Sequence, residues 1–405
     1  MLKNMASQLK TVFNADRSLK IIAWLSLAGL VLGMLLSLPL WLNDRLFPLV
    51  PLFSKMPVLP NVMEWVVLLG CLLSLLIALV VQRQVLWILA ASLLLILLVQ
   101  DQMRWQPWVY IYALFLTPFA IWGKQISDAN NQEKLRLCIQ VVLIGIYFWS
   151  GISKFNPHFV QVTYTLMLEN LVGAQPGDVL WDFKTLGYLI PIVETAIGIG
   201  LFFPKSRKWA TIAALLTHTI IIVYVLSQKG IQNFIILPWN LVMMGTVFLS
   251  CYSADNAIRF RYWPKKTGKK QVRAKWVLPA LALAVLTWGM PLLRFGNLWD
   301  NYLSFNLYSD NISYLYVGLR PEIVPEVEPT VAAYFTANEI MEEGETLDVF
   351  SWSLSELKVP VYPEERVFKQ IAHHFCEQYP AEALMFIEFK LPFDAGKAKL
   401  SRCSQ

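Results

Sequence analysis

Two ionisable side chains, Glu194 and His218, lie where a lipid environment makes charge expensive. Each falls near the middle of an apolar run, at 186–203 and 208–227 respectively. A charge at the centre of a bilayer costs at least about 2.5 to 3.5 kcal/mol, so such residues are functional candidates. Equal depth on consecutive antiparallel helices predicts that the two contact each other or a shared polar group. A Glu beside a His would keep the imidazole protonated or fix its tautomer; the alternative is an interhelical hydrogen bond of structural value.

Further polar residues extend this set of candidates. Asn240 lies at similar depth in the next apolar run, although an isolated Asn more often joins helices by hydrogen bonds. The segment DQMRWQPWVYIY (101–112) forms the richest polar cluster near the outer ends of two runs, and contains Asp101, Gln102 and Arg104. Asp101 and Arg104 can pair around a helix end, whereas the aromatic residues also fit an interfacial belt.

The elements that must position these residues are membrane-spanning helices. The chain has 405 residues, of which 56% are hydrophobic and only 15% charged, with a mean hydropathy of +0.50. A soluble domain is about one quarter charged. Apolar runs of roughly 16 to 23 residues match a hydrocarbon core about 30 Å thick, so we expect about nine spans. They are 20–42, 62–81, 85–100, 107–123, 136–151, 186–203, 208–227, 231–251 and 276–294.

The distribution of Lys and Arg predicts the orientation of these spans. The net charge of +6 comes from short segments between runs, which argues against a nucleic-acid partner. Alternate segments hold most of the cations, above all the stretch 259–275, and positive segments stay in the cytoplasm. We therefore expect an integral protein of a bacterial inner membrane, with the N-terminus cytoplasmic and the C-terminal tail periplasmic. The stretch 259–275 could also bind anionic lipid.

The sequence predicts two domains: a membrane bundle at 1–294 and an extracytoplasmic domain at 295–405. In the second, alternation from Leu303 to Val317 suits strands, EERVFKQIAHHFCEQY suits a helix and ALMFIEFKL a further strand. The predicted fold class is thus an all-α polytopic membrane bundle with a small C-terminal α+β domain. Cys376 and Cys403 are expected to form a disulfide if the tail faces an oxidising compartment.

Motifs for other chemistries are weak or missing. The chain has no GxGxxG, P-loop, GxSxG or HExxH motif. The AHHFC segment, with His373, His374 and Cys376, lacks a fourth ligand, so no metal is expected. No internal repeat supports a secondary transporter.

Three segments resemble the membrane domain of vitamin K-dependent γ-carboxylases and their bacterial relatives, the HTTM family. They are GIYFWSGISKFNPHF (145–159), DQMRWQPWVYIYALF (101–115) and PIVETAIGIGLFFPKSRKWATIAALLTH (191–218). The resemblance covers about residues 60 to 320, and Lys154, Glu194 and His218 match the family pattern. It implies the same bundle and an extracytoplasmic tail rich in strands.

Two positions depart from that family. Gln102 stands where the carboxylases have the Lys that takes a proton from vitamin K hydroquinone, and Ile221 stands where they have Asn. An amide cannot act as that base, so we expect no glutamate carboxylation. Because Lys154 is at a span end, it is expected to snorkel to the interface rather than replace the base.

These observations suggest a multi-pass protein that holds a hydrophobic small molecule, a quinone or a lipid, between its helices and opens to the outer side. The alternative is a non-catalytic subunit or anchor of a cell-envelope assembly, with the tail as the surface that docks an envelope protein. Membrane lipids are expected partners in either case. The sequence leaves open whether the protein catalyses a reaction.

Overall fold

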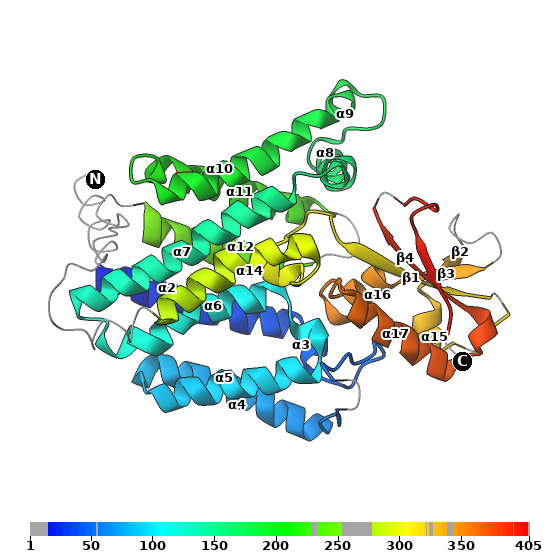
Figure 1. Ribbon diagram of the computed structural model, residues 1–405, viewed down its shortest axis with the longest axis horizontal. Helices are drawn as coiled ribbons and strands as arrows, with labels where there is room; N and C mark the ends of the chain where they lie inside the picture. The colour runs from blue at the N-terminus through cyan, green and yellow to red at the C-terminus, as the bar shows by residue number, and fades with distance from the viewer. Residues whose placement is uncertain are drawn as a thin grey trace.

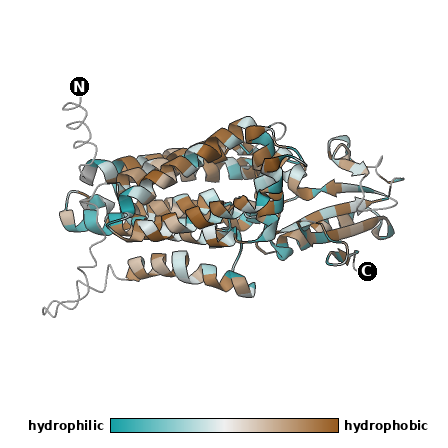
Figure 2. Cartoon of the chain, turned by 90° about the horizontal axis from the view of Figure 1, so that it is seen from above, coloured by the Kyte–Doolittle hydropathy of each residue, from teal (hydrophilic) through white to brown (hydrophobic). Residues whose placement is uncertain are grey.

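The computed structural model describes residues 15–53, 56–228, 233–252, 278–320, 322–323, 327–337, 344–391 and 393–403. The cationic stretch 259–275 and residues 229–232 therefore lie outside the described residues. Long helices run side by side in one bundle, and a smaller domain with a sheet lies at one end of it (Figure 1). Apolar residues dominate the length of the bundle, while more hydrophilic residues gather toward its ends (Figure 2).

Six helical segments among the described residues are long and apolar enough to cross a membrane. These segments are Arg17–Leu36, Asn61–Val81, Ala129–Ser153, Lys184–Phe202, Arg207–Ser227 and Leu278–Gly296. Three shorter apolar helices, Gln84–Gln100, Pro107–Trp122 and Ile236–Cys251, occupy the other predicted runs. A helix rises about 1.5 Å per residue, so these three fall short of a core about 30 Å thick. The membrane-helix bundle is confirmed, and the count of nine complete crossings stays a prediction.

The bundle is built from helices that pack both against sequence neighbours and against helices far apart in the chain. The helices are α2 (Ala15–Leu36), α3 (Leu38–Trp41), α4 (Asn61–Val81), α5 (Gln84–Gln100), α6 (Pro107–Trp122), α7 (Ala129–Ser153), α8 (Thr165–Val172), α9 (Val179–Asp182), α10 (Leu189–Phe202), α11 (Arg207–Ser227), α12 (Ile236–Cys251) and α14 (Met290–Leu293). Short 3₁₀ or π segments are η1 (Gln102–Arg104), η2 (Gly123–Gln125), η3 (Phe159–Tyr164), η4 (Lys184–Tyr188), η6 (Val285–Gly289), η7 (Arg294–Gly296) and η8 (Tyr302–Ser304). Close packing joins α7 to α10, α4 to α5, α11 to α12 and α2 to α12.

The first predicted span is interrupted. Helix α2 ends at Leu36, and α3 begins after Ser37 with Pro39 in its first turn. Proline cannot donate a backbone hydrogen bond and clashes with the preceding turn, so a continuous helix to residue 42 is not formed.

The C-terminal domain is a five-stranded antiparallel sheet in the order β2-β3-β1-β4-β5, packed against two helices. Its elements are β1 (Ser313–Leu319), α15 (Pro329–Ala332), β2 (Phe335–Ala337), β3 (Glu345–Asp348), α16 (Val349–Leu357), α17 (Glu365–Gln378), η10 (Ala381–Ala383), β4 (Leu384–Lys390) and β5 (Lys399–Ser401). Tyr316 is paired with Asp348 on one side and Ile387 on the other. The predicted helix and the strand at ALMFIEFKL are confirmed as α17 and β4.

The strand predicted from Leu303 to Val317 is wrong in its first half. Backbone φ angles of 56° at Phe305, 49° at Tyr308 and 52° at Asp310 are left-handed, and β1 begins only at Ser313. A strand requires negative φ at each position, so alternation of side-chain type could not make this segment extended.

Candidate functional site

Lys154 and Glu194 form an ion pair inside the bundle. Lys154 is the C-terminal cap of α7, and its Nζ lies 2.7 Å from Oε2 of Glu194 on α10. Nζ also donates to Oγ of Ser150 at 2.7 Å. The two helices approach closely because Gly151 has no side chain: a Cβ there would clash with Oγ1 and the backbone N of Thr195. The pair keeps both charges neutralised in an environment that penalises isolated charge.

His218 belongs to a second group, with Tyr147 and Asn240. Its Nδ1 lies 2.6 Å from Oδ1 of Asn240, and its Nε2 lies 2.6 Å from the hydroxyl of Tyr147. The amide nitrogen of Asn240 donates to the carbonyl of Ile236 at 2.7 Å, which turns its oxygen toward the imidazole. An oxygen acceptor at Nδ1 requires a proton there, so Nε2 accepts the Tyr147 hydrogen. All three side chains are buried.

Glu194 and His218 were predicted to contact each other or a shared polar group, but each has its own set of partners. Among the described residues no hydrogen bond joins them; α7 supplies Lys154 to Glu194 and Tyr147 to His218. Tyr147 and Lys154 are seven residues apart, or two turns, and so lie on one helix face. Gly198 brings this face against α10, because a Cβ there would be 2.7 Å from the backbone N of Phe148.

Asp101 and Arg104 lie in a buried network of four charges at the start of α4 and the end of α5. Asp101 pairs with Arg45 at 2.5 Å, Arg104 pairs with Glu64 at 2.8 Å, and Asp101 and Arg104 approach to 3.9 Å. Arg104 also donates to the carbonyls of Leu40 and Leu97, each at 3.0 Å. Glu64 was not among the residues predicted from the sequence, although an acid in the first turn of an apolar helix was a usable signal. This network holds the helix ends together, and its charged groups form ion pairs with one another.

Gln102 joins the bundle to the C-terminal domain. Its amide nitrogen donates to the carbonyl of Pro51 at 3.0 Å, and its oxygen accepts from Nε of Arg366 on α17 at 2.6 Å. Arg366 also binds Asp300 through a hydrogen bond of 2.8 Å. Hydrogen bonds to Asp300 raise the pKa of Arg366 above its ordinary value. Gln102 thus has a structural role at this position.

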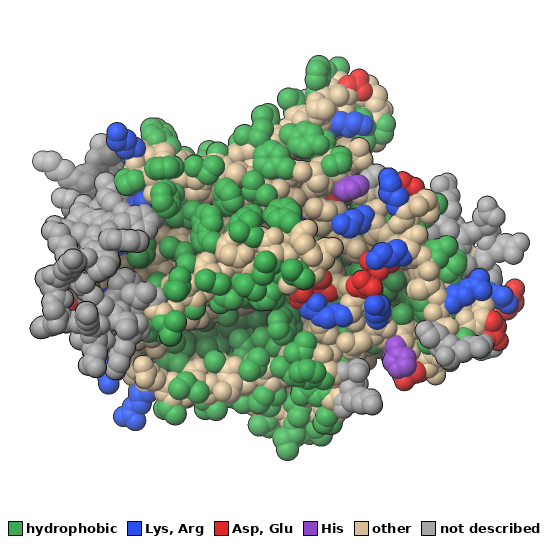
Figure 3. Space-filling view, viewed as in Figure 1, with side chains coloured by type: hydrophobic (Ala, Val, Ile, Leu, Met, Phe, Trp, Pro, Cys, Tyr) green, Lys and Arg blue, Asp and Glu red, His purple; other side chains and the backbone are tan. Residues whose placement is uncertain are grey.

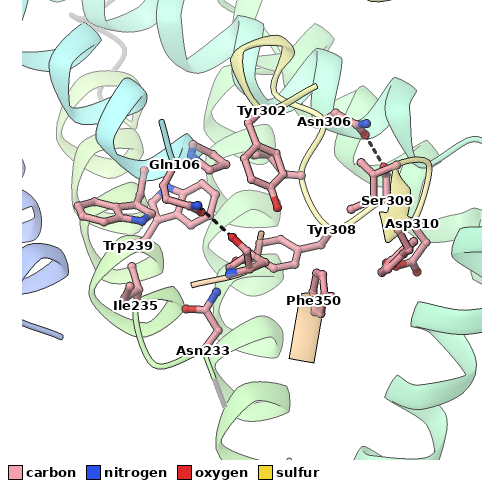
Figure 4. A pocket seen from close by; sticks show the side chains of 16 residues that line it. Gln106, Asn233, Ile235, Trp239, Tyr302, Asn306, Tyr308, Ser309, Asp310 and Phe350 are labelled. Carbon is pink, nitrogen blue, oxygen red and sulfur yellow. Dashed lines mark hydrogen bonds between the residues drawn. The ribbon is translucent and has the colours of Figure 1, made fainter. Parts of the chain in front are cut away.

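The structure also reveals a cavity of about 70 Å³ that the sequence did not predict, which we call the junction cavity (Figure 4). It lies where the first turns of α6 and α12 meet the loop before β1. At roughly 10 to 15 Å³ for one water, it has room for several waters or one small ring. Its lining is Gln106, Pro107, Trp108, Asn233, Ile235, Trp239, Tyr302, Asn306, Leu307, Tyr308, Ser309, Asp310, Ile312, Tyr314, Phe350 and Pro360.

One wall of the junction cavity is a strained loop. Tyr308 and Asp310 have left-handed backbone conformations, which are rare for bulky residues and cost energy unless the surroundings enforce them. The side chain of Asp310 accepts from the backbone N of Thr163 at 3.1 Å and from the hydroxyl of Tyr314 at 3.3 Å. Asn156 donates to the carbonyl of Ser309 at 3.0 Å. Burial raises the pKa of Asp310, while its hydrogen bonds oppose this change.

Three buried polar atoms of the lining have no hydrogen-bond partner among the described residues. They are the indole Nε1 atoms of Trp108 and Trp239 and Oδ1 of Asn233. In Figure 4, Trp239 and Gln106 lie to the left of Tyr302 and Tyr308 in the lining of the cavity. Buried polar groups are nearly always paired in native proteins, so these atoms indicate a missing partner.

Comparison with known proteins gives one match. Residues 132–233 match the family model described as methylamine utilisation protein MauE. No curated protein and no solved structure matches the chain. We call residues 132–233 the MauE-like segment. It runs from α7 to the residues before α12 and carries Tyr147, Lys154, Glu194 and His218.

The resemblance to the HTTM family is wrong, because the family model that matches is MauE. The positions that carried the resemblance, Lys154, Glu194 and His218, all lie in the MauE-like segment. The segment that contains Gln102 lies outside the MauE-like segment. The Gln102 side chain is hydrogen-bonded to Pro51 and Arg366. The MauE-like segment also supplies Asn156 and Thr163, which hold the strained loop of the junction cavity.

The cysteines of the tail and His373 have partners other than a metal ion. Cys376 and Cys403 form a disulfide. Nε2 of His373 lies 3.2 Å from Glu377 on the surface of α17. The described residues contain no group of three or more His, Cys, Asp or Glu side chains that could hold a metal.

Proposed function

We propose that this chain is an inner-membrane protein that binds a hydrophobic small molecule in the junction cavity, on the periplasmic side. The observation that carries the proposal is the cavity itself, enclosed by aromatic side chains and bounded by a loop in strained conformation. Strain of this kind is concentrated at ligand sites because the surroundings must maintain it. Aromatic walls with a few polar groups are typical of small-molecule sites.

The orientation is supported by the charge distribution and by the disulfide of the tail. Positive segments resist translocation, and structural disulfides form in oxidising compartments such as the periplasm. In Figure 3, side chains of Lys, Arg, Asp and Glu gather over the C-terminal domain and its junction with the bundle, and hydrophobic side chains cover the bundle. An alkaline phosphatase fused to the C-terminus should be active and a fluorescent protein dark. The reverse pattern would overturn this orientation.

Native mass spectrometry of gently purified protein tests ligand binding. The wild type should retain an added mass, which its fragmentation assigns to a quinone or to a lipid. Ile235→Trp, which fills the cavity from a buried position, should lose that mass. Leu241→Trp, on the exposed side of the same helix, is the matched control and should keep it. An added mass that is equal in all three proteins would contradict the proposal.

The second candidate is an anchor for an envelope assembly, favoured by the rigid attachment of the C-terminal domain. Oε1 of Glu356 accepts from the backbone N of Leu46 at 2.6 Å and of Phe47 at 2.8 Å. The rings of Phe47 and Trp352 lie 4.6 Å apart. The MauE match suggests methylamine utilisation as the setting for such an assembly. A stable partner subunit in the mass spectrum, and loss of growth on methylamine after gene deletion, would support this candidate. The absence of both results would contradict it.

A further inference from the structure

The lining of the junction cavity indicates the chemistry of its ligand, an inference that rests on the proposed function. Two of its three unpaired polar atoms are indole N–H groups, those of Trp108 and Trp239. An indole nitrogen is only a donor, so its partner must be an acceptor. Both residues are largely buried, at 3% and 6% exposure, so bulk water does not satisfy them.

The charge of the lining restricts the ligand further. Among the described residues that line the cavity there is no Lys, Arg or His, and the one acid is Asp310. Asp310 already accepts from Thr163 and Tyr314, and burial raises the pKa of its carboxyl group. An anionic ligand would find no cation here, and a carboxylate that already accepts from three donor groups is a poor counter-ion for a cation. The lining therefore suits an uncharged molecule.

Aromatic side chains determine the shape of the junction cavity. Trp239 and Tyr308 have centroids 6.1 Å apart, and Tyr302, Tyr314 and Phe350 complete the aromatic lining. Aromatic faces pack well against flat molecules, and a rigid wall loses little entropy on binding. The strained loop is held by Asn156 and Thr163, so the wall is formed before the ligand arrives.

We propose that the junction cavity selects an uncharged planar molecule whose carbonyl oxygens accept hydrogen bonds from the indole groups of Trp108 and Trp239. Carbonyl oxygens carry two lone pairs and match N–H donors without requiring a charge. The unpaired Oδ1 of Asn233 could accept from a hydroxyl or amide of the same molecule.

A matched pair of probes tests this proposal on the purified full chain. Tetramethyl-1,4-benzoquinone and 1,2,4,5-tetramethylbenzene share the ring and four methyl groups, and only the first has carbonyls. Equilibrium dialysis in detergent should show binding of the quinone that is at least about 3-fold tighter than that of the hydrocarbon. Trp239→Phe keeps the ring and removes the donor, and should weaken quinone binding about 3- to 10-fold without changing hydrocarbon binding. Trp108→Phe should act in the same direction.

Trp288→Phe is the control, because the Trp288 indole donates to the carbonyl of Val141 outside the cavity at 3.2 Å. It should leave both affinities unchanged. Equal binding of the two probes, with no effect of Trp239→Phe, would overturn carbonyl recognition while leaving the proposed function standing. Absence of binding by either probe to the folded wild type would also overturn this inference. The proposed function itself is contradicted by a wild type that retains no added mass, or by an added mass that is equal in the wild type, Ile235→Trp and Leu241→Trp.

Discussion

Nζ of Lys154 lies 2.7 Å from Oε2 of Glu194, with side-chain exposures of 9% and 15%. The pair joins the end of α7 to the middle of α10 within the MauE-like segment. Since α7 also supplies Tyr147 to His218, one face of α7 contacts both Glu194 and His218 through its own polar side chains. The contribution of these contacts to the free energy of unfolding can be measured.

Removing one partner of the Lys154–Glu194 pair should strongly destabilise the bundle. Glu194→Leu and Lys154→Met each leave an uncompensated buried charge, at a cost of about 3 to 5 kcal/mol in the free energy of unfolding. The double variant should be more stable than either single variant, because neither charge remains. Equilibrium unfolding in detergent measures all three. Lys184→Met, at an exposed lysine of the same face of the membrane, is the control, and simple additivity of the two single effects would contradict the coupling.

The hydrogen bond between Tyr147 and His218 should hold one imidazole tautomer. Nitrogen NMR of protein labelled at histidine should show Nδ1 protonated and Nε2 free of a proton at neutral pH. Tyr147→Phe removes the donor to Nε2 and should lower the free energy of unfolding by about 1 to 3 kcal/mol. Tyr188→Phe, at a half-buried tyrosine whose hydroxyl has no hydrogen bond to another described residue, should change it little. A proton on Nε2 in the wild type would show that Tyr147 accepts instead.

Arg366 should control how tightly the C-terminal domain is attached. Its side chain is 43% exposed, so Arg366→Ala should cost only about 1 kcal/mol, and hydrogen exchange should rise at 49–53 and 297–305. Gln102→Lys should increase exchange further, because it brings a second cation to the Arg366 guanidinium. Lys369→Ala, on the exposed surface of the same helix, should leave exchange at the junction unchanged. Equal exchange in all the variants would mean that apolar contacts alone hold the domain.

Asp348 should give the C-terminal domain a pH-dependent stability. Its carboxylate caps α16 by accepting from the backbone N of Phe350 at 2.9 Å, yet burial raises its pKa above the ordinary 3.8. An acid whose pKa is raised in the folded state favours folding when protonated. The wild type should therefore gain stability relative to Asp348→Asn as pH falls through the raised pKa toward 3.8.

Asn is also a good N-terminal cap, so this variant isolates ionisation from capping. Asp348→Ala loses the cap and should be less stable by about 1 kcal/mol at every pH. Thermal unfolding of the purified protein between pH 4 and pH 7 measures both effects. A constant difference between wild type and Asp348→Asn over this range would rule out the ionisation effect.

Local patterns in the sequence determined the elements of this protein. Apolar runs placed helices in the bundle, and the spacing of Val367, Ile371, His374 and Phe375 predicted α17, because amphipathic periodicity depends only on neighbouring residues. The same logic failed from Leu303 to Ile312. There, Ser309 and Asp310 are held by hydrogen bonds from Asn156 and Thr163, which lie far away in the chain.

The tertiary structure alone decided which polar residues meet. Glu194 pairs with Lys154 and not with His218, because glycines at 151 and 198 let α7 approach α10 closely. Gln102 meets Arg366, 264 positions away, only because α17 lies over the outer loops. The junction cavity likewise combines the starts of α6 and α12 with the loop before β1. A single sequence carries the residue types at such sites, but their distances arise only when distant segments pack against each other.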